Sequence, residues 1–469
     1  MKWADIKNSF SDFWKEFKRV KSGIFGLVLF IIFLLIVIFE PLVLPFGEVN
    51  DTWRDITYWE DNPKSAQPEW TNFFRSEKLS TSSKLTDPEV HINDMGALKM
   101  ETVSFKYDYQ FSGAPKDIVL KAHGTGNPLI VLSVTRPDGE EIELLQKPLF
   151  LEDGSDVRIS LAKDSRDSVY EFARDYESRV NVGKSDPKLF DVPMVLFSKA
   201  QEGILRDSLS EALKGEYTFS ANIILQNEND TMDDFSLIIP GQVYGVLGTD
   251  AYKRDLWSGV LAGVKWALLI GILTAIVSVS IGVIFGVVSA YYGGWKDSLM
   301  QRIFEIFRSI PLLPLLIVLS AVFKPSLFML IGMMCIFFWT GPVKTVRSMA
   351  MQIKEETYIE ATRALGGGHG RIIFKHMVPL LIPYSFASMA LFIPGAIVYE
   401  ATISLLGLGD ATIVTWGQIL SDALKNGAVL NGLWWWVVPP GLCIALMGMA
   451  FAFIGFAMDK ILHPKLRTR

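Results

Sequence analysis

Six stretches of the chain are long, apolar and almost free of charged residues, and they constrain the fold more than any other feature. A helix needs roughly 20 apolar residues to cross the hydrocarbon core of a bilayer. Apolar stretches near that length indicate transmembrane helices, so we predict an all-α polytopic membrane protein with six of them. The predicted spans are residues 23–39, 266–295, 309–323 with an extension back through Met300, 325–343, 377–399 and 427–458.

The charge is distributed unevenly along the chain. Residues 46–250 carry 21 basic and 36 acidic side chains, for a net charge of −15, whereas the remaining residues have a net charge of +10. An acidic block therefore lies within a basic and more apolar frame. This division excludes a uniform soluble globule, and it excludes a nucleic-acid-binding protein, which would carry clustered basic patches. The two cysteines lie in apolar runs and supply neither a zinc framework nor a disulfide-rich scaffold.

Basic residues gather in three short segments outside the predicted spans: before the first, between the fourth and fifth, and after the sixth. Cytoplasmic loops of membrane proteins are enriched in lysine and arginine. With six spans all three segments fall on one side, so we predict that both termini are cytoplasmic. The acidic block then lies on the extracellular or periplasmic side.

Residues 1–45 combine a basic amphipathic segment with the first apolar stretch. Aromatic and apolar residues from Trp3 to Phe17 recur at helical spacing between lysines, which is typical of a helix lying in the membrane interface. A poorly ordered tail is the alternative. We predict that the apolar stretch is an uncleaved anchor and not a signal peptide, because Glu40-Pro41 follows it and no small-residue cleavage site does.

Residues 46–246 are too long and too charged for a connecting loop, and we predict an inserted extracellular β-rich domain, a sandwich with helical additions. Alternating apolar residues indicate strands within 118–132 and 217–225. The turn sequence Arg136-Pro137-Asp138-Gly139 precedes a strand at 140–145, which predicts a hairpin. Helices are expected at 171–180 and 205–213. The isolated histidines His91 and His123 indicate no metal site.

The segment between the fourth and fifth spans is rich in glycine. It reads Tyr358-Ile359-Glu360-Ala361-Thr362-Arg363-Ala364-Leu365-Gly366, with three more glycines before Arg371. Because glycine commonly ends a helix, we predict a helix at 353–365, a sharp break, and a second helix rising from Arg371 into the membrane. Such a segment presents a rigid projection to a partner. A solvated amphipathic loop helix is the simpler alternative.

Glu360-Ala361-Thr362, with Gly366 and the downstream Val378-Pro379, resembles the signature loop of ABC-importer permeases. In that family the loop forms a coupling helix that docks into a cleft on the ATPase subunit. Thr362 replaces an alanine that is usual there, which is a small change. The resemblance implies a coupling loop at 353–376 and an ATPase-coupling role for Tyr358, Glu360, Ala361, Thr362, Arg363 and Gly366.

Further motifs narrow the resemblance to the C-type permease of dipeptide and oligopeptide importers. Lys253 stands where that family usually has a glycine. The resemblance covers about 1–45 and 246–469, so the predicted domains are 1–45, the insertion 46–246, and a permease core 247–469 with five spans. The motifs are Gly248-Thr249-Asp250 with Arg254-Asp255, Tyr291-Tyr292-Gly293-Gly294-Trp295 with Asp297, and Leu405-Leu406-Gly407-Leu408-Gly409 with Trp416-Gly417.

The resemblance implies a type I ABC-importer permease fold and a subunit of an ATP-driven, binding-protein-dependent importer in a bacterial or archaeal cell membrane. The implied partners are a homologous second permease, two ATPase subunits, an extracellular substrate-binding protein and membrane lipid, without nucleic acid. The chain has no Gly-x-x-x-x-Gly-Lys-Ser/Thr phosphate loop. We therefore expect no cofactor and no enzymatic activity in this chain, with ATP and Mg²⁺ bound by partner subunits. Peptides are the expected substrates, and oligosaccharides or nickel are alternatives.

In two groups of residues in the predicted spans, the spacing places the members on one face of a helix. Arg302, Glu305 and Arg308 are three residues apart and share one helix face. Ionisable groups at membrane depth pair with one another or face a cavity, so we expect either a gate or ATPase-facing contact at the inner face, or an intrahelical salt-bridge stripe. Gly282 and Gly286 form a small-residue face suited to close helix packing.

Two other classes of protein fit parts of the sequence. A membrane-anchored sensor or enzyme would work through the acidic block, but it would need only one or two spans and a polar catalytic constellation. An ion-coupled secondary transporter would show inverted repeats and charges near the membrane midplane, and no convincing repeat is present. Association with an ATPase discriminates the three hypotheses.

Overall fold

The computed structural model of the protein describes residues 14–44, 49–94, 99–179, 190–199, 204–205, 211–227, 229–323 and 326–462. The chain divides into two compact units. One is helical and contains Met1–Arg54 with Ser258–Arg469, and the other, which is rich in strands, contains Asp55–Trp257. Both boundaries lie somewhat to the C-terminal side of 46 and 246. The predicted interfacial helix lies mostly in residues 1–13, outside the described residues.

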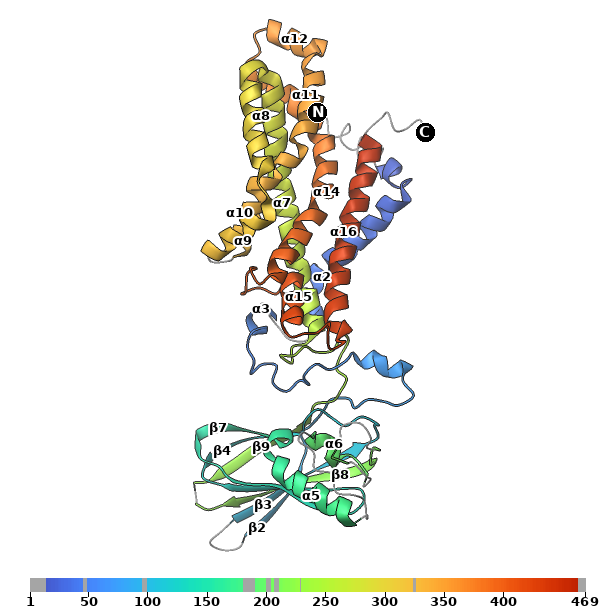
Figure 1. Ribbon diagram of the computed structural model, residues 1–469, viewed down its shortest axis with the longest axis vertical. Coiled ribbons are helices and arrows are strands. Elements are labelled where there is room, and N and C mark those ends of the chain that lie inside the picture. The colour runs from blue at the N-terminus through green and yellow to red at the C-terminus, as the bar shows by residue number, and fades with distance from the viewer. Residues whose placement is uncertain are drawn as a thin grey trace. The chain divides into compact units, whose positions relative to one another are not determined.

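The helical unit is built from elements that run mostly along one direction (Figure 1). The π-helical segment Ile372–Met377 joins two of them into a continuous helical path. In chain order the elements are α2 (Lys21–Val43), α3 (Val49–Thr52), α7 (Leu256–Tyr292), α8 (Gly294–Ser309), α9 (Leu312–Val322), α10 (Leu327–Phe338), α11 (Thr340–Lys354), α12 (Thr357–Ala364), α13 (His369–Arg371), α14 (Val378–Leu405), α15 (Trp416–Lys425) and α16 (Trp434–Leu462).

Within the described residues, five helical segments are long and apolar enough to cross a membrane, and a sixth crossing arises if α8 and α9 are counted as one. These two helices meet at an angle of 71°, so the predicted third span consists of two helices. Pro311 explains the break. Proline has no backbone N–H and disfavours a helical conformation in the residue before it, and Ile310 has an extended ψ of 123°.

Two spans begin at residues other than those predicted. α7 begins at Leu256 and continues through Lys265, the charged residue just before the predicted start. The ammonium of Lys265 forms a 2.7 Å ion pair with Glu40 of α2. α16 begins at Trp434, because Gly432, with a φ of 68°, belongs to the turns that precede it. Hydropathy alone therefore locates neither helix start.

Glycines bring α7 and α11 into close contact. An added Cβ at Gly282 would lie 2.4 Å from the backbone O of Trp339, and one at Gly286 would lie 2.8 Å from the side chain of Val346. The predicted role of these glycines in close helix packing is confirmed. The same principle applies where α2 meets α16, since a Cβ at Gly26 would lie 2.6 Å from the backbone O of Ala450.

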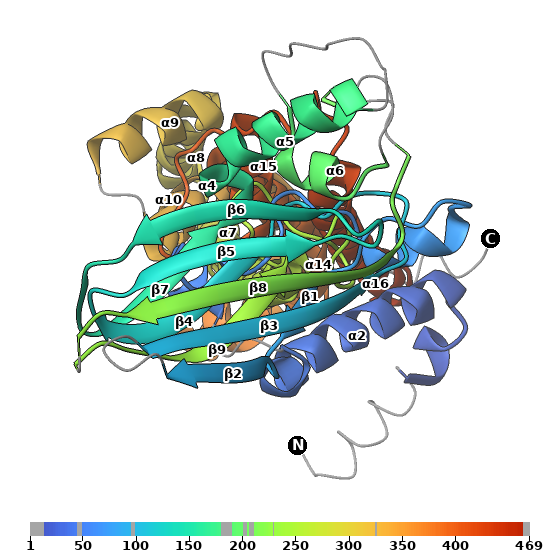
Figure 2. The ribbon, with the colours of Figure 1, turned by 90° about the horizontal axis from the view of Figure 1, so that it is seen from below.

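The second unit contains two antiparallel sheets, and Figure 2 shows the strands of one sheet lying over those of the other. One sheet has the strand order β1-β9-β4-β7, and the other has the order β2-β3-β8-β5-β6. Helices α4 (Leu161–Asp164), α5 (Arg166–Arg179) and α6 (Val192–Leu196), with the 3-10 turn Glu69–Phe74, complete the unit. The strands are β1 (Ser83–Leu85), β2 (Glu89–Asp94), β3 (Lys99–Tyr109), β4 (Val119–Gly126), β5 (Leu129–Thr135), β6 (Glu141–Pro148), β7 (Leu151–Ser160), β8 (Gly215–Leu225) and β9 (Thr231–Ile239).

One apolar core joins the two sheets, as expected of a sandwich. Ile118 and Leu120 enter it from the first sheet, and Tyr109 and Tyr217 enter it from the second. Along β8 every second residue is buried, which is the alternation that predicted this strand. The rings of Tyr217 and Phe197 lie 4.4 Å apart between their centroids, so aromatic packing fills the end of the core near α6.

The predictions for this unit are confirmed in part. β5 and β6 form the predicted hairpin, since Thr135 pairs with Glu141 across the turn. The strands predicted within 118–132 are β4 and the start of β5, which Gly126, with a φ of 85°, and Pro128 separate and which belong to different sheets. The helix predicted at 171–180 is the second half of α5. Residues 206–210 of the helix predicted at 205–213 lie outside the described residues, and 211–213 is extended and hydrogen-bonded to 197–199.

Candidate functional site

The segment with the glycine-rich motif forms a short helix, a break and a long helix, as predicted, but the short helix begins later. α11 continues to Lys354, the extended backbone of Glu356 (ψ 135°) interrupts it, and α12 starts at Thr357 and not at residue 353. Gly366, with a φ of 80°, ends α12. The N–H of Gly367 donates to the backbone O of Thr362 at 2.9 Å, which closes the helix end.

One face of α12 is anchored to the helical unit. Ile359 is 1% exposed and belongs to an apolar cluster that includes Tyr291 of α7, Val346 of α11 and Met377. The Tyr291 hydroxyl lies 2.6 Å from Nδ1 of His369, just beyond the glycine break. These contacts fix α12 at the end of the unit where α8 begins and α11 ends (Figure 1).

Most of the remaining surface of α12 is exposed, and Arg363, one turn after Ile359, lies 5.8 Å from the centroid of the Tyr291 ring. Tyr358, Glu360, Ala361 and Arg363 are exposed, Thr362 is partly exposed, and Leu365 is 89% exposed. The predicted coupling residues therefore lie together on one short helix, with Gly366 at its end. Apolar and charged side chains side by side on an anchored helix form a surface suited to contact with another protein chain.

A partly buried ion pair, which sequence reasoning missed, joins α8 to α11. Nε of Arg347 donates to Asp297 at 2.8 Å, and the Ser289 hydroxyl of α7 donates to the same carboxylate. Gln301 donates to Ser289 at 3.0 Å. Asp297 was noted only as part of a motif, and the one available signal was a carboxylate and a guanidinium near the ends of two apolar stretches.

The three charged residues of α8 do not act as one set. Arg302 and Glu305 form an exposed 3.0 Å salt bridge within the helix, which is the arrangement expected of a salt-bridge stripe. Arg308 has no acidic partner among the described residues. Its guanidinium lies 5.9 Å from the centroid of the buried Phe304 ring, and it lines a pocket of about 520 Å³ between α8, α10, α11 and α14.

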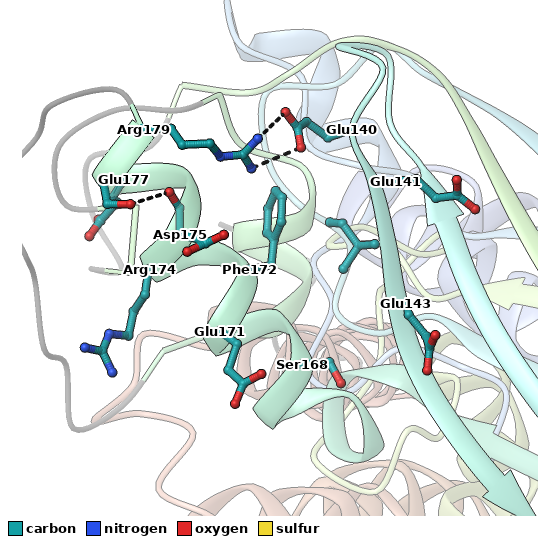
Figure 3. Close-up of a pocket in the computed structure, with 12 residues that line it drawn as sticks. Glu140, Glu141, Glu143, Ser168, Glu171, Phe172, Arg174, Asp175, Glu177 and Arg179 are labelled. Carbon is teal, nitrogen blue, oxygen red and sulfur yellow. Dashed lines mark hydrogen bonds and ion pairs between the residues drawn. The ribbon is translucent and has the colours of Figure 1, made fainter.

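A second pocket, of about 800 Å³, lies in the sandwich unit between α5 and β6 (Figure 3). Its lining is acidic and includes Glu141, Glu143 and Glu171. Arg179 of α5 makes a two-pronged contact with Glu140, with nitrogen–oxygen distances of 3.0 and 3.1 Å. This pair holds the end of α5 against the edge of the sheet.

Two family models match the chain. The model of binding-protein-dependent transport system inner membrane components matches residues 282–468, and the model of the N-terminal transmembrane domain of oligopeptide transport permease C matches residues 9–59. Residues 60–281, which include most of the sandwich unit, lie outside both models. A solved structure of the MetNI methionine ABC transporter in an inward-facing conformation covers 44% of this chain and 96% of its own at 22% identity, with a TM-score of 0.34.

Two relatives are similar to about half of the chain. The dipeptide transport system permease protein DppC of Bacillus subtilis is 35% identical over 221 residues, which cover 47% of this chain and 68% of the relative. The oligopeptide transport system permease protein OppC of the same organism is 36% identical over 222 residues, which cover 47% and 72%. The chain therefore belongs to the family of binding-protein-dependent ABC-importer permeases, as a multi-pass membrane protein. The predicted resemblance to this family is confirmed, and the relatives are transport subunits.

Proposed function

We propose that this chain forms half of the translocation path of an ATP-driven importer of dipeptides or oligopeptides, and that α12 is its contact with an ATPase subunit. The observation that supports the coupling role most directly is the two-sided character of α12. Ile359 anchors one face, and Glu360 and Ala361 are exposed on the other. Displacement of such a helix is transmitted to the spans on which it rests.

The proposed topology has six crossings, with the bent pair α8–α9 as one of them. Both termini then lie in the cytoplasm, and the sandwich lies outside the cell or in the periplasm. The basic residues between α11 and α14 support a cytoplasmic position for α12. The proposed location of the chain is the cell membrane of a bacterium or an archaeon.

The proposed complex contains a homologous second permease, two ATPase subunits and an extracellular binding protein. ATP and Mg²⁺ would bind to the ATPase subunits, and this chain would contribute Glu360, Ala361, Thr362, Arg363 and Gly366, with Tyr358, to the coupling contact. Peptides are proposed as substrates because the similar proteins carry dipeptide and oligopeptide names.

The proposal is tested by reconstituting the chain with its partners in proteoliposomes and measuring uptake of a radiolabelled tripeptide. We expect uptake that requires ATP on the side of the membrane where the ATPase subunits are bound. Uptake should also require the binding protein on the opposite side. Uptake that is driven by an ion gradient through this chain without an ATPase would contradict it. Import of a sugar or nickel, with no peptide import, would contradict the substrate class and leave the coupling role intact.

A further inference from the structure

The pocket beside Arg308 is a cavity within the helical unit. It lies where α8 ends and α9 begins, and α10, α11 and α14 complete its walls. Aromatic rings make up much of the lining: Phe307 from α8, Phe337 and Phe338 from α10, and Phe392 and Tyr399 from α14. Its volume of about 520 Å³ lies in the range typical of small-molecule sites.

Two glycines shape this pocket. A Cβ at Gly341 would lie 2.2 Å from the end of the Phe392 ring, so this ring rests directly on the α11 backbone. A Cβ at Gly395 would meet nothing within 4 Å, so the wall of α14 is open at that position. The break at Pro311 turns α9 away from α8, and Phe307 and Ile310 on the N-terminal side of this break line the pocket.

The electrostatic character of the pocket is positive. No Asp or Glu is among its lining residues. Arg308 and Lys344 approach the buried ring of Phe304 to 5.9 and 5.4 Å, and neither has an acidic partner in the described part of the chain. Arg302, by contrast, is paired with Glu305. In the proposed topology α8 and α9 form one crossing, and an ionisable residue within a crossing is by default a candidate functional residue.

We propose that this pocket receives the C-terminal residue of the transported peptide, with the terminal carboxylate at the guanidinium of Arg308 and the side chain against the aromatic wall. This inference rests on the proposed function as a peptide importer. A guanidinium binds a carboxylate through two parallel N–H···O bonds, which adds geometric selectivity to charge. An aromatic wall accepts many apolar side chains. We therefore expect the pocket to select for a free C-terminal carboxylate and to discriminate little between C-terminal side chains.

The experiment uses the complete reconstituted complex and a matched pair of peptides, one tripeptide with a C-terminal phenylalanine carboxylate and its C-terminal amide. Uptake of both is measured for the wild type, Arg308→Gln, Arg308→Lys and the control Arg302→Gln. Because the binding protein is the same throughout, a change in the acid-to-amide ratio reports on this chain. We expect Arg308→Gln to lower the ratio about tenfold or more, Arg308→Lys to restore part of it, and Arg302→Gln to leave it unchanged.

A second measurement does not require uptake of the amide. A peptide that ends in a photoreactive benzoyl-phenylalanine is cross-linked to the complex, and we expect labelled residues on α14 between Phe392 and Tyr399, with the acid competing better than the amide. Equal slowing of both peptides by Arg308→Gln, or labels elsewhere, would overturn the carboxylate site. If the wild type drives ATP hydrolysis but imports neither peptide, the proposed substrate class fails and this inference with it.

Discussion

The helical unit and the sandwich place apolar residues in opposite positions. α2 is the most apolar of the candidate spans, yet only 17% of its most apolar window is buried. In the sandwich, Ile118, Ile130 and Ile223 are fully buried and polar side chains alternate with apolar ones along the strands. The same physical rule holds in two solvents: lipid accepts the exposed apolar face of α2, and water accepts the polar face of the strands.

This difference means that the two units depend on different interactions for stability. In lipid there is little hydrophobic drive between helices, so close packing at glycines and buried polar contacts hold the helical unit together. In water the sandwich is stabilised by burial of its core. Substitutions can therefore destabilise one unit while the other keeps its stability, and hydrogen exchange of the full-length chain reads the two separately.

The largest effect is expected from Gly282→Leu. The new Cβ would meet the backbone O of Trp339 at 2.4 Å, and backbone relieves a clash less easily than a side chain. We expect a loss of about 3 kcal/mol in the free energy of unfolding of the helical unit, with unchanged hydrogen exchange in the sandwich. Gly441→Leu on α16, where a Cβ meets nothing within 4 Å, is the control. Equal unfolding midpoints in detergent for both variants would disprove the packing role.

The Asp297–Arg347 pair is expected to have the next largest effect. Asp297→Ala leaves Arg347 without its partner, and because the Arg347 side chain is 28% exposed we expect a cost of about 2 kcal/mol, below that of a fully buried pair. The measurement is a double-mutant cycle with Arg347→Ala, monitored by thermal unfolding. Costs that simply add would show that the pair contributes no coupling energy.

In the sandwich, Asp230 tests a polar contact of another kind. Its carboxylate accepts N–H groups of Asn127, Gln226 and Asn227 at 2.9 to 3.0 Å. We expect Asp230→Ala to destabilise the sandwich by about 2 kcal/mol, measured as faster hydrogen exchange in β8 and β9, with the exposed Asp233→Ala as control. Faster exchange in the helical spans, with none in these strands, would contradict the independence of the two units.

Asp230 also makes the stability of the sandwich depend on pH. Burial favours its neutral form, but the backbone N–H donors outweigh this and hold the pKa of the carboxyl below its usual value. Its contribution is therefore fully present above the ordinary aspartate pKa of the unfolded chain and is lost as the pH falls through the lower, folded pKa. The pKa of an aspartate in an unfolded chain is roughly 4. On acidification below that pH, the wild type should lose more stability than Asp230→Asn. Parallel curves would refute this.

The smallest effect is expected at Lys253, where the family usually has glycine. Lys253 has a left-handed φ of 67°, and its ammonium donates to the backbone O of Glu60 at 2.8 Å. Lys253→Gly removes strain and a hydrogen bond together, so we expect a change below about 1 kcal/mol. Lys253→Ala keeps the strain and loses the bond, and should destabilise by about 1 kcal/mol. The order of the two unfolding midpoints checks this, and the reverse order would contradict it.

Hydropathy located most spans because a charge-free run of the required length has few alternatives. A break or kink at Pro311 could be predicted from the sequence, but its angle of 71° could not, because the angle at a proline depends on the helices that pack around it. The segment 118–132 alternates only in places, and its division into β4 and β5 of different sheets follows from strand pairing and not from the local pattern. The start of α12 was placed early because nothing local in Ile353–Glu356 excludes a helix.

The candidate site was predictable to different degrees. The coupling residues form a continuous motif, so one short helix brings them together. The pair Asp297–Arg347 and the pocket beside Arg308 join elements that are distant in the sequence. Spacing along α8 grouped Arg308 with Arg302 and Glu305, whereas the kink and the walls from α10 and α14 give it a different environment. The packing of the helices brings these distant residues together, and no local sequence pattern indicates it.

The central claim is that α12 carries the contact with the ATPase, and a charge reversal on its exposed face tests this most directly. The measurement is the amount of ATPase subunit that co-purifies with the tagged chain from membranes, for Glu360→Lys and for the control Glu141→Lys on the sandwich surface. We predict at least a tenfold loss for Glu360→Lys, since buried interface charges of the wrong sign cost several kcal/mol, and no loss for Glu141→Lys. Full retention of the ATPase by Glu360→Lys, with unchanged peptide uptake, would contradict the claim.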